Sequence, residues 1–290
     1  MNPSLSPAPA PASGAAPADP PEFVIEAGRA SSHYWGDLWR YRELLIFLAW
    51  RDIVVRYKQA ALGFAWAVVQ PLVTMVMFTF VFSNLAHMPS GSVPYPLLVL
   101  AGLLPWQLFS SALSGTSGSL VSNTNLISKI YFPRLVIPIS SLGVALADFA
   151  ITLLLYFGFA IGFHVWPTWR ILLMPIFMVV TLIIALGAGL WLSALTVKYR
   201  DFRFLVPFLL QFGVFATPVG YRTDVLHTWG GLLAINPLTG MIAGFRWSLL
   251  GSEFQLDPAT MAISALGAAL LLVSGLWYFR KTERQFVDII

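Results

Sequence analysis

Residues 59–128 have the sequence QAALGFAWAVVQPLVTMVMFTFVFSNLAHMPSGSVPYPLLVLAGLLPWQLFSSALSGTSGSLVSNTNLIS, which contains no Asp, Glu, Lys or Arg. A water-soluble domain, in which about 25% of the residues are usually charged, could not solvate the surface of so long an uncharged run. A membrane-spanning helix needs about 20 apolar residues, and this run holds two such stretches separated by a short polar turn. The run therefore predicts an integral membrane protein.

The composition of the whole chain agrees with this prediction. Of the 290 residues, 58% are hydrophobic and only 10% are charged, and the mean hydropathy is +0.76. The net charge of +4 indicates membrane topology rather than nucleic-acid binding, because the basic residues cluster at the ends of apolar segments. The absence of cysteine excludes a disulfide scaffold and thiolate metal ligands.

We expect an all-α membrane protein with six spans. Residues 1–35 are rich in Pro and Ala and are expected to form a disordered cytoplasmic tail, whereas residues 36–290 should form one membrane domain. The predicted spans are bounded by polar, charged or Pro/Gly-containing turns, and they are Phe64–Ala86, Leu97–Leu120, Val136–Phe163, Ile171–Val197, Phe204–Val219 and Ala259–Phe279.

The distribution of Lys and Arg predicts the orientation of these spans. If both termini lie in the cytoplasm, only Arg170, Arg222 and Arg246 of the 17 basic residues fall on the outside. Cytoplasmic loops of membrane proteins carry such an excess of Lys and Arg. We therefore expect both termini to be cytoplasmic.

The segment Tyr221–Gly251 is the uncertain part of this count. Its stretch Leu232–Leu250 is nearly apolar enough for a seventh span, but it contains Asn236-Pro237 and Arg246. A seventh crossing would also place the basic residues 280–284 outside. We expect a re-entrant helical hairpin in the outer leaflet, which is tolerated where protein buries it or where it lines a pathway.

Two cytoplasmic segments differ from ordinary connections. Asp37–Gln59 has a short apolar run flanked by Arg, Trp and Tyr residues, which predicts an amphipathic helix that lies in the cytoplasmic leaflet or against the bundle. The loop Ser122–Pro138 carries apolar residues around Lys129 and continues through Pro133-Arg134. A short exposed helix of this kind docks a partner, although a simple interfacial turn is the alternative.

The polar groups within the spans allow more than one role. Asp148 lies near the middle of the third span, where a carboxylate is costly unless it is paired, protonated or facing water. It either lines a pathway or relays protons, or it accepts hydrogen bonds from Ser and Thr of neighbouring helices. We favour the second role because no basic partner is evident. The small and hydroxyl residues of 110–119 either pack helices closely or line a wet pathway.

The sequence offers no catalytic constellation. Its four His residues are scattered, and it contains neither an HExxH zinc motif nor a GxxxxGK phosphate loop. We therefore expect no enzyme, no bound metal and no cofactor. If nucleotide energy drives this protein, another chain must hydrolyse the nucleotide.

Several blocks together resemble one protein family. The region of about residues 35–285 resembles the membrane subunit of type-2 ABC exporters of lipid-linked polysaccharides, such as O-antigen, capsule and teichoic acid, and RYKQ, GLLPW and KIYFPR are most similar to the O-antigen branch. The blocks are WRYRELLIFLAWRDIVVRYKQAALGFAWAVVQPL (39–72), PYPLLVLAGLLPWQLF (94–109), SNTNLISKIYFPRLVIPI (122–139), VKYRDFRFLVPFLLQFGVFATPVGY (197–221) and INPLTGMIAGFRWSLLG (235–251).

The resemblance implies an assembly and a set of functional segments. It implies a homodimer in the bacterial inner membrane, bound to two copies of a separate ATPase that carries the ATP and Mg²⁺. An interface helix would correspond to Asp37–Gln59, a coupling helix to Asn123–Arg134, and outer gate helices to Tyr221–Gly251. The implied coupling residues are Asn123, Leu126, Lys129, Tyr131, Phe132, Pro133 and Arg134, and the implied aromatic channel residues are Tyr57, Trp106, Phe109 and Tyr221.

Export of a lipid-linked polysaccharide is the function that we favour. A sugar polymer needs a hydrated path, because burying each hydroxyl in hydrocarbon costs several kcal/mol. A permease of the same architecture that exports a drug or lipid is the alternative. The missing acid–base and metal groups disfavour a membrane glycosyltransferase or acyltransferase. A secondary transporter would show an inverted repeat and paired intramembrane charges, which we do not find in the sequence.

Overall fold

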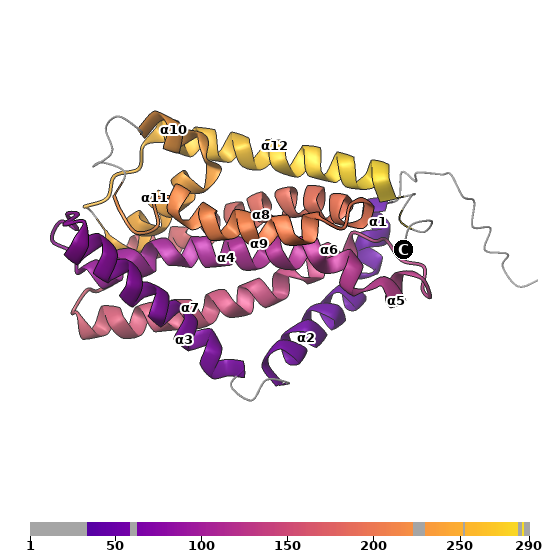
Figure 1. Cartoon of the computed structure of the whole chain (residues 1–290), viewed down its shortest axis with the longest axis horizontal. Helices are drawn as coiled ribbons and strands as arrows, with labels where there is room; N and C mark the ends of the chain where they lie inside the picture. Colours follow the sequence, from indigo (N-terminus) through magenta and orange to yellow (C-terminus); the bar gives the residue numbers. More distant parts are fainter. Residues whose placement is uncertain (1–33, 59–62, 223–229, 252, 284–285, 287–290) are drawn as a thin grey trace, which may run out of the picture.

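The computed structural model describes residues 34–58, 63–222, 230–251, 253–283 and 286, and these residues form helices without any strand. The predicted disordered tail, residues 1–35, lies almost wholly outside the described residues. Figure 1 shows long helices that run side by side in one bundle. Helices α1 and α5 and the last turns of α12 lie at one end of the bundle, and α10 and α11 lie at the other.

Five helical segments in the described part of the chain are long and apolar enough to cross a membrane. They correspond to the predicted first, second, third, fourth and sixth spans. In the third segment, α6 and α7 are separated only by Ser141. The segments are Phe64–Leu85 (α3, Gly63–Thr79, then the π-helix η1, Phe80–Leu85), Tyr95–Ser122 (α4), Val136–Gly162 (α6, Val136–Ser140, and α7, Leu142–Gly162), Trp169–Lys198 (η2, Trp169–Leu173, and α8, Met174–Lys198) and Pro258–Thr282 (α12).

The predicted fifth span is shorter than the others. Helix α9 covers Phe202–Ala216, and its 15 residues reach about 22 Å, less than the hydrocarbon thickness of about 30 Å. The helix ends because Thr217 adopts an extended conformation before Pro218, as a residue preceding proline usually does. Five spans are therefore supported by length and composition, and the crossing of α9 stays a prediction.

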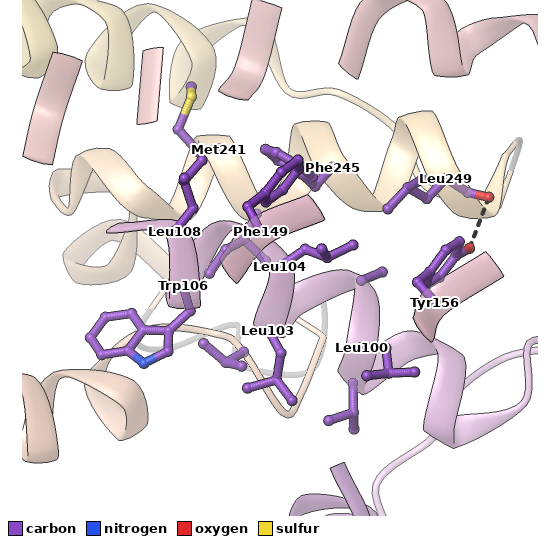
Figure 2. Packing of buried hydrophobic residues seen from close by; sticks show 14 of the residues in the cluster. Leu100, Leu103, Leu104, Trp106, Leu108, Phe149, Tyr156, Met241, Phe245 and Leu249 are labelled. Carbon is purple, nitrogen blue, oxygen red and sulfur yellow. Dashed lines mark hydrogen bonds between the residues drawn. The ribbon is translucent and has the colours of Figure 1, made fainter. Parts of the chain in front are cut away.

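Helix α4 lies at the centre of the bundle. In its most apolar stretch 78% of the residues are buried, and it packs against α3, α7, α8 and α11. Figure 2 shows Leu104 and Leu108 of α4 beside Phe149 of α7 and Phe245 of α11. The apolar side chains of α4 thus form the core around which the other helices are arranged.

Glycines allow α8 and α12 to approach each other closely. A Cβ atom on Gly187 would lie 2.5 Å from the backbone carbon of Leu271, and one on Gly275 would lie 2.3 Å from the carbonyl oxygen of Gly187. Backbones can come this close only where both helices lack side chains, which is a common feature of membrane helix pairs.

The segment after α9 contains two short helices, α10 (Gly230–Ile235) and α11 (Pro237–Leu250). They are separated at Asn236, whose side chain accepts a hydrogen bond of 3.0 Å from the backbone N–H of Leu238. Helix α11 has 14 residues, too few for a seventh span, and most of them are buried. The helix is thus interrupted before Pro237. The expected re-entrant hairpin over Tyr221–Gly251, of which residues 223–229 lie outside the described residues, stays a prediction.

Helices α1 (Tyr34–Arg40) and α2 (Arg42–Lys58) precede the first span. Figure 1 shows α2 slanting along the bundle, so that α2 and α3 form a V. Leu48 of α2 is buried against the bundle, whereas Phe47 and Trp50 are exposed. The helix therefore packs on the bundle with one side, and its placement in a lipid leaflet stays a prediction.

Candidate functional site

A polar cavity of about 690 Å³ opens between α2, α3, α4 and α7, with one residue contributed by α6 and one by α9. It lies among helices whose other surfaces are largely apolar, which makes its polar lining unusual. The lining residues are Asp52, Val55, Arg56, Ala67, Gln70, Pro71, Trp106, Gln107, Ser110, Ser111, Ser114, Gly115, Ser119, Ser122, Asn123, Ile137, Ser141, Val144, Asp148, Thr152 and Leu210.

The hydroxyl groups of α4 divide between the cavity and the helix interfaces. Ser111 and Ser114 line the cavity. Thr116 instead is fully buried where α8 passes, since a Cβ atom on Gly189 would lie 2.6 Å from its methyl group. The close packing expected for residues 110–119 is therefore present on one side of the helix, and a wet pathway on the other side stays a prediction.

Asp148 connects three elements at the wall of this cavity. Its carboxylate accepts hydrogen bonds from the hydroxyls of Tyr57 (2.5 Å) and Ser111 (2.9 Å), and it forms an ion pair of 2.8 Å with Arg56. The expected serine partner on a neighbouring helix is confirmed. The sequence shows no evident basic partner for Asp148, but in the structure Arg56 pairs with it from α2, far away in the sequence.

The phenol of Tyr57 is held in its neutral form by this arrangement. Burial raises the pKa of Tyr57, and the hydrogen bond to the Asp148 carboxylate and its negative charge raise this pKa further. Tyr57 therefore serves as a hydrogen-bond donor to Asp148.

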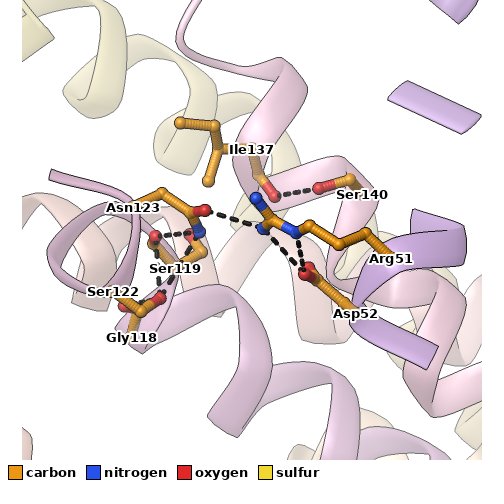
Figure 3. A network of polar contacts seen from close by, with 8 residues as sticks. All are labelled: Arg51, Asp52, Gly118, Ser119, Ser122, Asn123, Ile137 and Ser140. Atoms are coloured by element: carbon orange, nitrogen blue, oxygen red, sulfur yellow. Dashed lines mark hydrogen bonds and ion pairs between the residues drawn. The ribbon is translucent and has the colours of Figure 1, made fainter. Parts of the chain in front are cut away.

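A second polar link joins α2 to the end of α4. Figure 3 shows Arg51 of α2 reaching Asp52 and Asn123. Its Nη2 atom donates to the Asp52 carboxylate at 2.7 Å and to the side-chain oxygen of Asn123 at 2.8 Å. The amide nitrogen of Asn123 donates to the carbonyl oxygen of Ser119 at 2.9 Å, so that its amide group has a fixed orientation.

The predicted coupling segment, Asn123–Arg134, begins with the single-turn helix α5 (Thr124–Ile127). Beyond it Lys129 and Ile130 are exposed, and Tyr131 is 80% exposed. These three residues form the exposed tip of the segment, and Leu126, beside them in α5, is half-buried.

The end of the same segment is attached to the bundle. The side chain of Phe132 is only 5% exposed, and Pro133 beside it is half-buried. The backbone N–H of Arg134 donates to the carboxylate of Glu283 at 3.3 Å, and its guanidinium donates to the Glu283 carbonyl and lies 5.9 Å from the ring centre of Phe286. The structure thus separates the predicted coupling residues into an exposed tip and an anchored end.

The four predicted aromatic channel residues do not form one cluster. Tyr57 is bonded to Asp148, and Trp106 lines the cavity with Phe109 beside it, their ring centres 5.8 Å apart. Tyr221 is buried elsewhere, and its ring packs on Phe82. Trp106 therefore lines the cavity, and Tyr57 and Phe109 contact residues that line it. The role of Tyr221 stays a prediction.

Buried polar contacts fix the chain that follows α9. Arg246 of α11 is 3% exposed and donates to the carbonyl oxygens of Val219 (2.7 Å) and Tyr221 (2.8 Å). The hydroxyl of Tyr95 donates to the carbonyl of Gly220 at 2.7 Å. The sequence shows Arg246 as a charge within an apolar stretch, but it does not show its partners, because backbone carbonyls carry no side-chain signature.

The described residues contain no group of three or more His, Asp or Glu side chains that could hold a metal ion. What they do contain is a polar cavity in an apolar helical bundle and an exposed tip beyond α5. This arrangement suits passage or binding of a polar molecule.

Comparison with known proteins places the chain in a family. Residues 43–250 match the ABC-2 type transporter family. The chain is 29% identical over 258 residues to the O-antigen export system permease protein RfbA of Myxococcus xanthus, covering 88% of this chain and 98% of that protein. It is 27% identical to the protein of the same name from Klebsiella pneumoniae, over 86% of this chain and 95% of the relative.

A more distant relative is the polysialic acid transport protein KpsM of Escherichia coli. It is 24% identical over 82% of this chain and 92% of its own length. Together with the match over residues 43–250, these similarities establish the family. The chain is a member of the ABC-2 type transporter family.

Proposed function

We propose that this chain is the permease subunit of an ABC transporter that exports a lipid-linked polysaccharide, of the O-antigen type, across the bacterial inner membrane. The observation that carries the proposal is the polar cavity of about 690 Å³ within an otherwise apolar bundle. The names of the relatives, which are O-antigen and polysialic acid export proteins, support the choice of substrate class.

The lining of the cavity suits a carbohydrate. The hydroxyls of Ser110, Ser111 and Ser114 and the amides of Gln70 and Gln107 can exchange hydrogen bonds with sugar hydroxyls, which would otherwise lose several kcal/mol each on leaving water. The ring of Trp106 offers an apolar face on which a sugar ring can rest. Hydrogen-bonding groups beside an aromatic ring bind sugars weakly, which permits a polymer to slide.

A second copy of the chain would complete the path. Helices α3 and α9 both contribute to the cavity lining, and elsewhere on their surfaces they present exposed apolar residues such as Val73, Val76 and Phe208. Only 11% of the most apolar stretch of α3 is buried within the protomer, compared with 78% for α4. A homodimer that covers α3 and α9 would enclose two such cavities as one channel, while lipid covers the outward faces of α8 and α12.

The energy would come from a separate ATPase that binds ATP and Mg²⁺. We assign the docking of this partner to the exposed tip of Lys129, Ile130 and Tyr131, at the end of the bundle that the excess of Lys and Arg assigns to the cytoplasm. Helices α10 and α11 would then form the outer gate at the opposite end. With this orientation α9 acts as the sixth crossing and α2 as the interface helix.

Depletion of the protein in its native bacterium tests the proposal. We expect lipid-linked polysaccharide to accumulate on the cytoplasmic side and surface polysaccharide to disappear, and re-expression of the intact chain should restore both. Purification of the restored protein should also recover an ABC ATPase. Unchanged surface polysaccharide after complete depletion would contradict the export function.

A further inference from the structure

Asp148 lies on α7, and its side chain forms hydrogen bonds or ion pairs with side chains of both α2 and α4. Arg56 and Tyr57 of α2 and Ser111 of α4 all contact its carboxylate. The side chain of Asp148 is 16% exposed and that of Arg56 is 51% exposed, so the pair lies at the edge of the cavity rather than in bulk water. Because solvent reaches Arg56, the ion pair is partly screened, and the hydrogen bonds from Tyr57 and Ser111 add to the contact.

Helix α2 also holds the first residue of the coupling segment. The guanidinium of Arg51 bonds the side chain of Asn123, where α4 ends and α5 begins (Figure 3). Asp52 pairs with the same guanidinium and fixes its direction. A displacement of the coupling segment therefore acts directly on α2.

The two links are joined by an unbroken stretch of helix. Arg51 and Arg56 lie five residues apart in α2, which corresponds to about 7.5 Å along the helix axis. A helix of this length moves as a rigid unit, because each of its turns is hydrogen-bonded to the next. The chain of contacts thus runs from Asn123 through Arg51, the backbone of α2 and Arg56 with Tyr57 to Asp148.

We propose that α2 transmits movement of the coupling segment to the cavity wall, with Asp148 as the positioning residue that receives it. This proposal rests on the proposed function, since it requires an ATPase that moves the tip of Lys129–Tyr131. Movement of that tip displaces α2 through Arg51, and α2 in turn displaces α7 and α4 through Asp148. The cavity widens or narrows because α4 and α7 form its walls.

Asp148 has a different role in this scheme from the two considered at the sequence level. It does not relay protons, and its contacts do more than stabilise a buried carboxylate. Its negative charge holds the cationic end of α2 against the helices of the cavity. Loss of that charge should leave docking and ATP hydrolysis intact while uncoupling them from the cavity.

Thiol labelling of the purified permease–ATPase complex can follow the movement, because the native chain contains no cysteine. Ser128→Cys, at an exposed position beside the tip, reports on the coupling segment, and Ser114→Cys reports on the cavity. In the otherwise unchanged chain, ATP with vanadate should change the labelling rate at both positions, by about fivefold for a coupling of ordinary size.

The substitution Asp148→Asn should abolish the nucleotide effect at Ser114→Cys and preserve it at Ser128→Cys. Arg56→Gln, which breaks the same ion pair from the more exposed side, should have the same result, and it keeps the test decisive if Asp148→Asn does not fold. Arg56→Lys, which retains the charge, should restore the response. Ser274→Ala, which removes the hydrogen bond of 3.1 Å between Trp191 of α8 and α12, is the control and should change neither position.

The outcomes separate this proposal from the proposed function. A persistent nucleotide effect at Ser114→Cys in both Asp148→Asn and Arg56→Gln would overturn the transmission by α2. A response at Ser128→Cys with none at Ser114→Cys in the otherwise unchanged chain would overturn it too. If Ser128→Cys itself shows no response, the docking of the ATPase is wrong, and the transmission is wrong with it.

Discussion

Individual polar residues in this bundle are stabilised by partners that are remote in the sequence. Asp148 is identifiable as a special residue from the sequence alone, because it is an acid within an apolar span. Its partner Arg56 is not, because no local pattern shows that α2 slants back to the level of Asp148. Arg246 was equally visible as a charge, yet its partners are backbone carbonyls that every residue has. Side-chain partners across helices therefore required the structure.

Replacement of Arg246 by Ala should destabilise the protein. Two charge-assisted hydrogen bonds would be lost and the carbonyls of Val219 and Tyr221 would be left buried, which together costs about 3 kcal/mol. Thermal unfolding of the purified protein in detergent would show the loss. Arg203→Ala, at an exposed position of α9, is the control and should change the stability by less than about 0.5 kcal/mol. Equal melting temperatures for the two variants would contradict the role of Arg246.

At the scale of elements, hydropathy predicted the long helices well and the short ones poorly. The five long apolar segments correspond to predicted spans, because about 20 apolar residues are a strong and local signal. The end of α9 at Ala216 was not predicted, since Pro218 is compatible with a kinked span as well as with a helix end. In the coupling segment, composition could not show that Phe132 is buried while Tyr131 is exposed, because both are aromatic residues in one short loop.

The close packing of α8 and α12 should depend on their glycines. Gly187→Ala would place a methyl group 2.5 Å from the backbone of Leu271, so the helices must separate, at a cost of about 2 kcal/mol. Gly158→Ala in α7, where a Cβ atom meets nothing within 4 Å, should be neutral or stabilising by up to about 1 kcal/mol. Unfolding temperatures measured side by side would check this, and a stable Gly187→Ala variant would refute the close approach.

The exposed tip and the anchored end of the coupling segment should respond differently to truncation. Tyr131→Ala removes an exposed ring and should reduce recovery of the ATPase in affinity purification while leaving the unfolding temperature unchanged. Phe132→Ala removes a buried ring and should lower stability by about 3–5 kcal/mol. The assignment of the tip fails if Tyr131→Ala retains the full amount of ATPase.

At the scale of the whole molecule, the charge bias predicts which end of the bundle faces the cytoplasm, and this orientation stays a prediction. The coupling segment and the end of α12 lie together at one end of the bundle, and α10 and α11 lie at the other, as two faces of a transporter require (Figure 1). The number of copies could not be derived from one sequence. The exposed apolar surface of α3 and α9 is the physical reason for expecting a second copy.

Labelling from the two sides of the membrane tests this orientation. In spheroplasts, Trp166→Cys in the exposed loop between α7 and η2 should react with a membrane-impermeant maleimide. Tyr131→Cys, which is similarly exposed, should react only after permeabilisation. The reverse pattern would mean that the chain is inserted with its termini outside.

Of the five helical segments in the described residues that are long enough to span a membrane, Phe64–Leu85, which contains α3, is the least buried within its own protomer. Once α4, α7 and α8 have assembled, α3 still has lipid on most of its surface until the proposed second copy covers it. A solitary protomer would therefore present to membrane proteases a loosely attached helix near its N-terminus. We therefore expect cells to degrade protomers that lack the proposed second copy or the proposed ATPase, beginning at that helix.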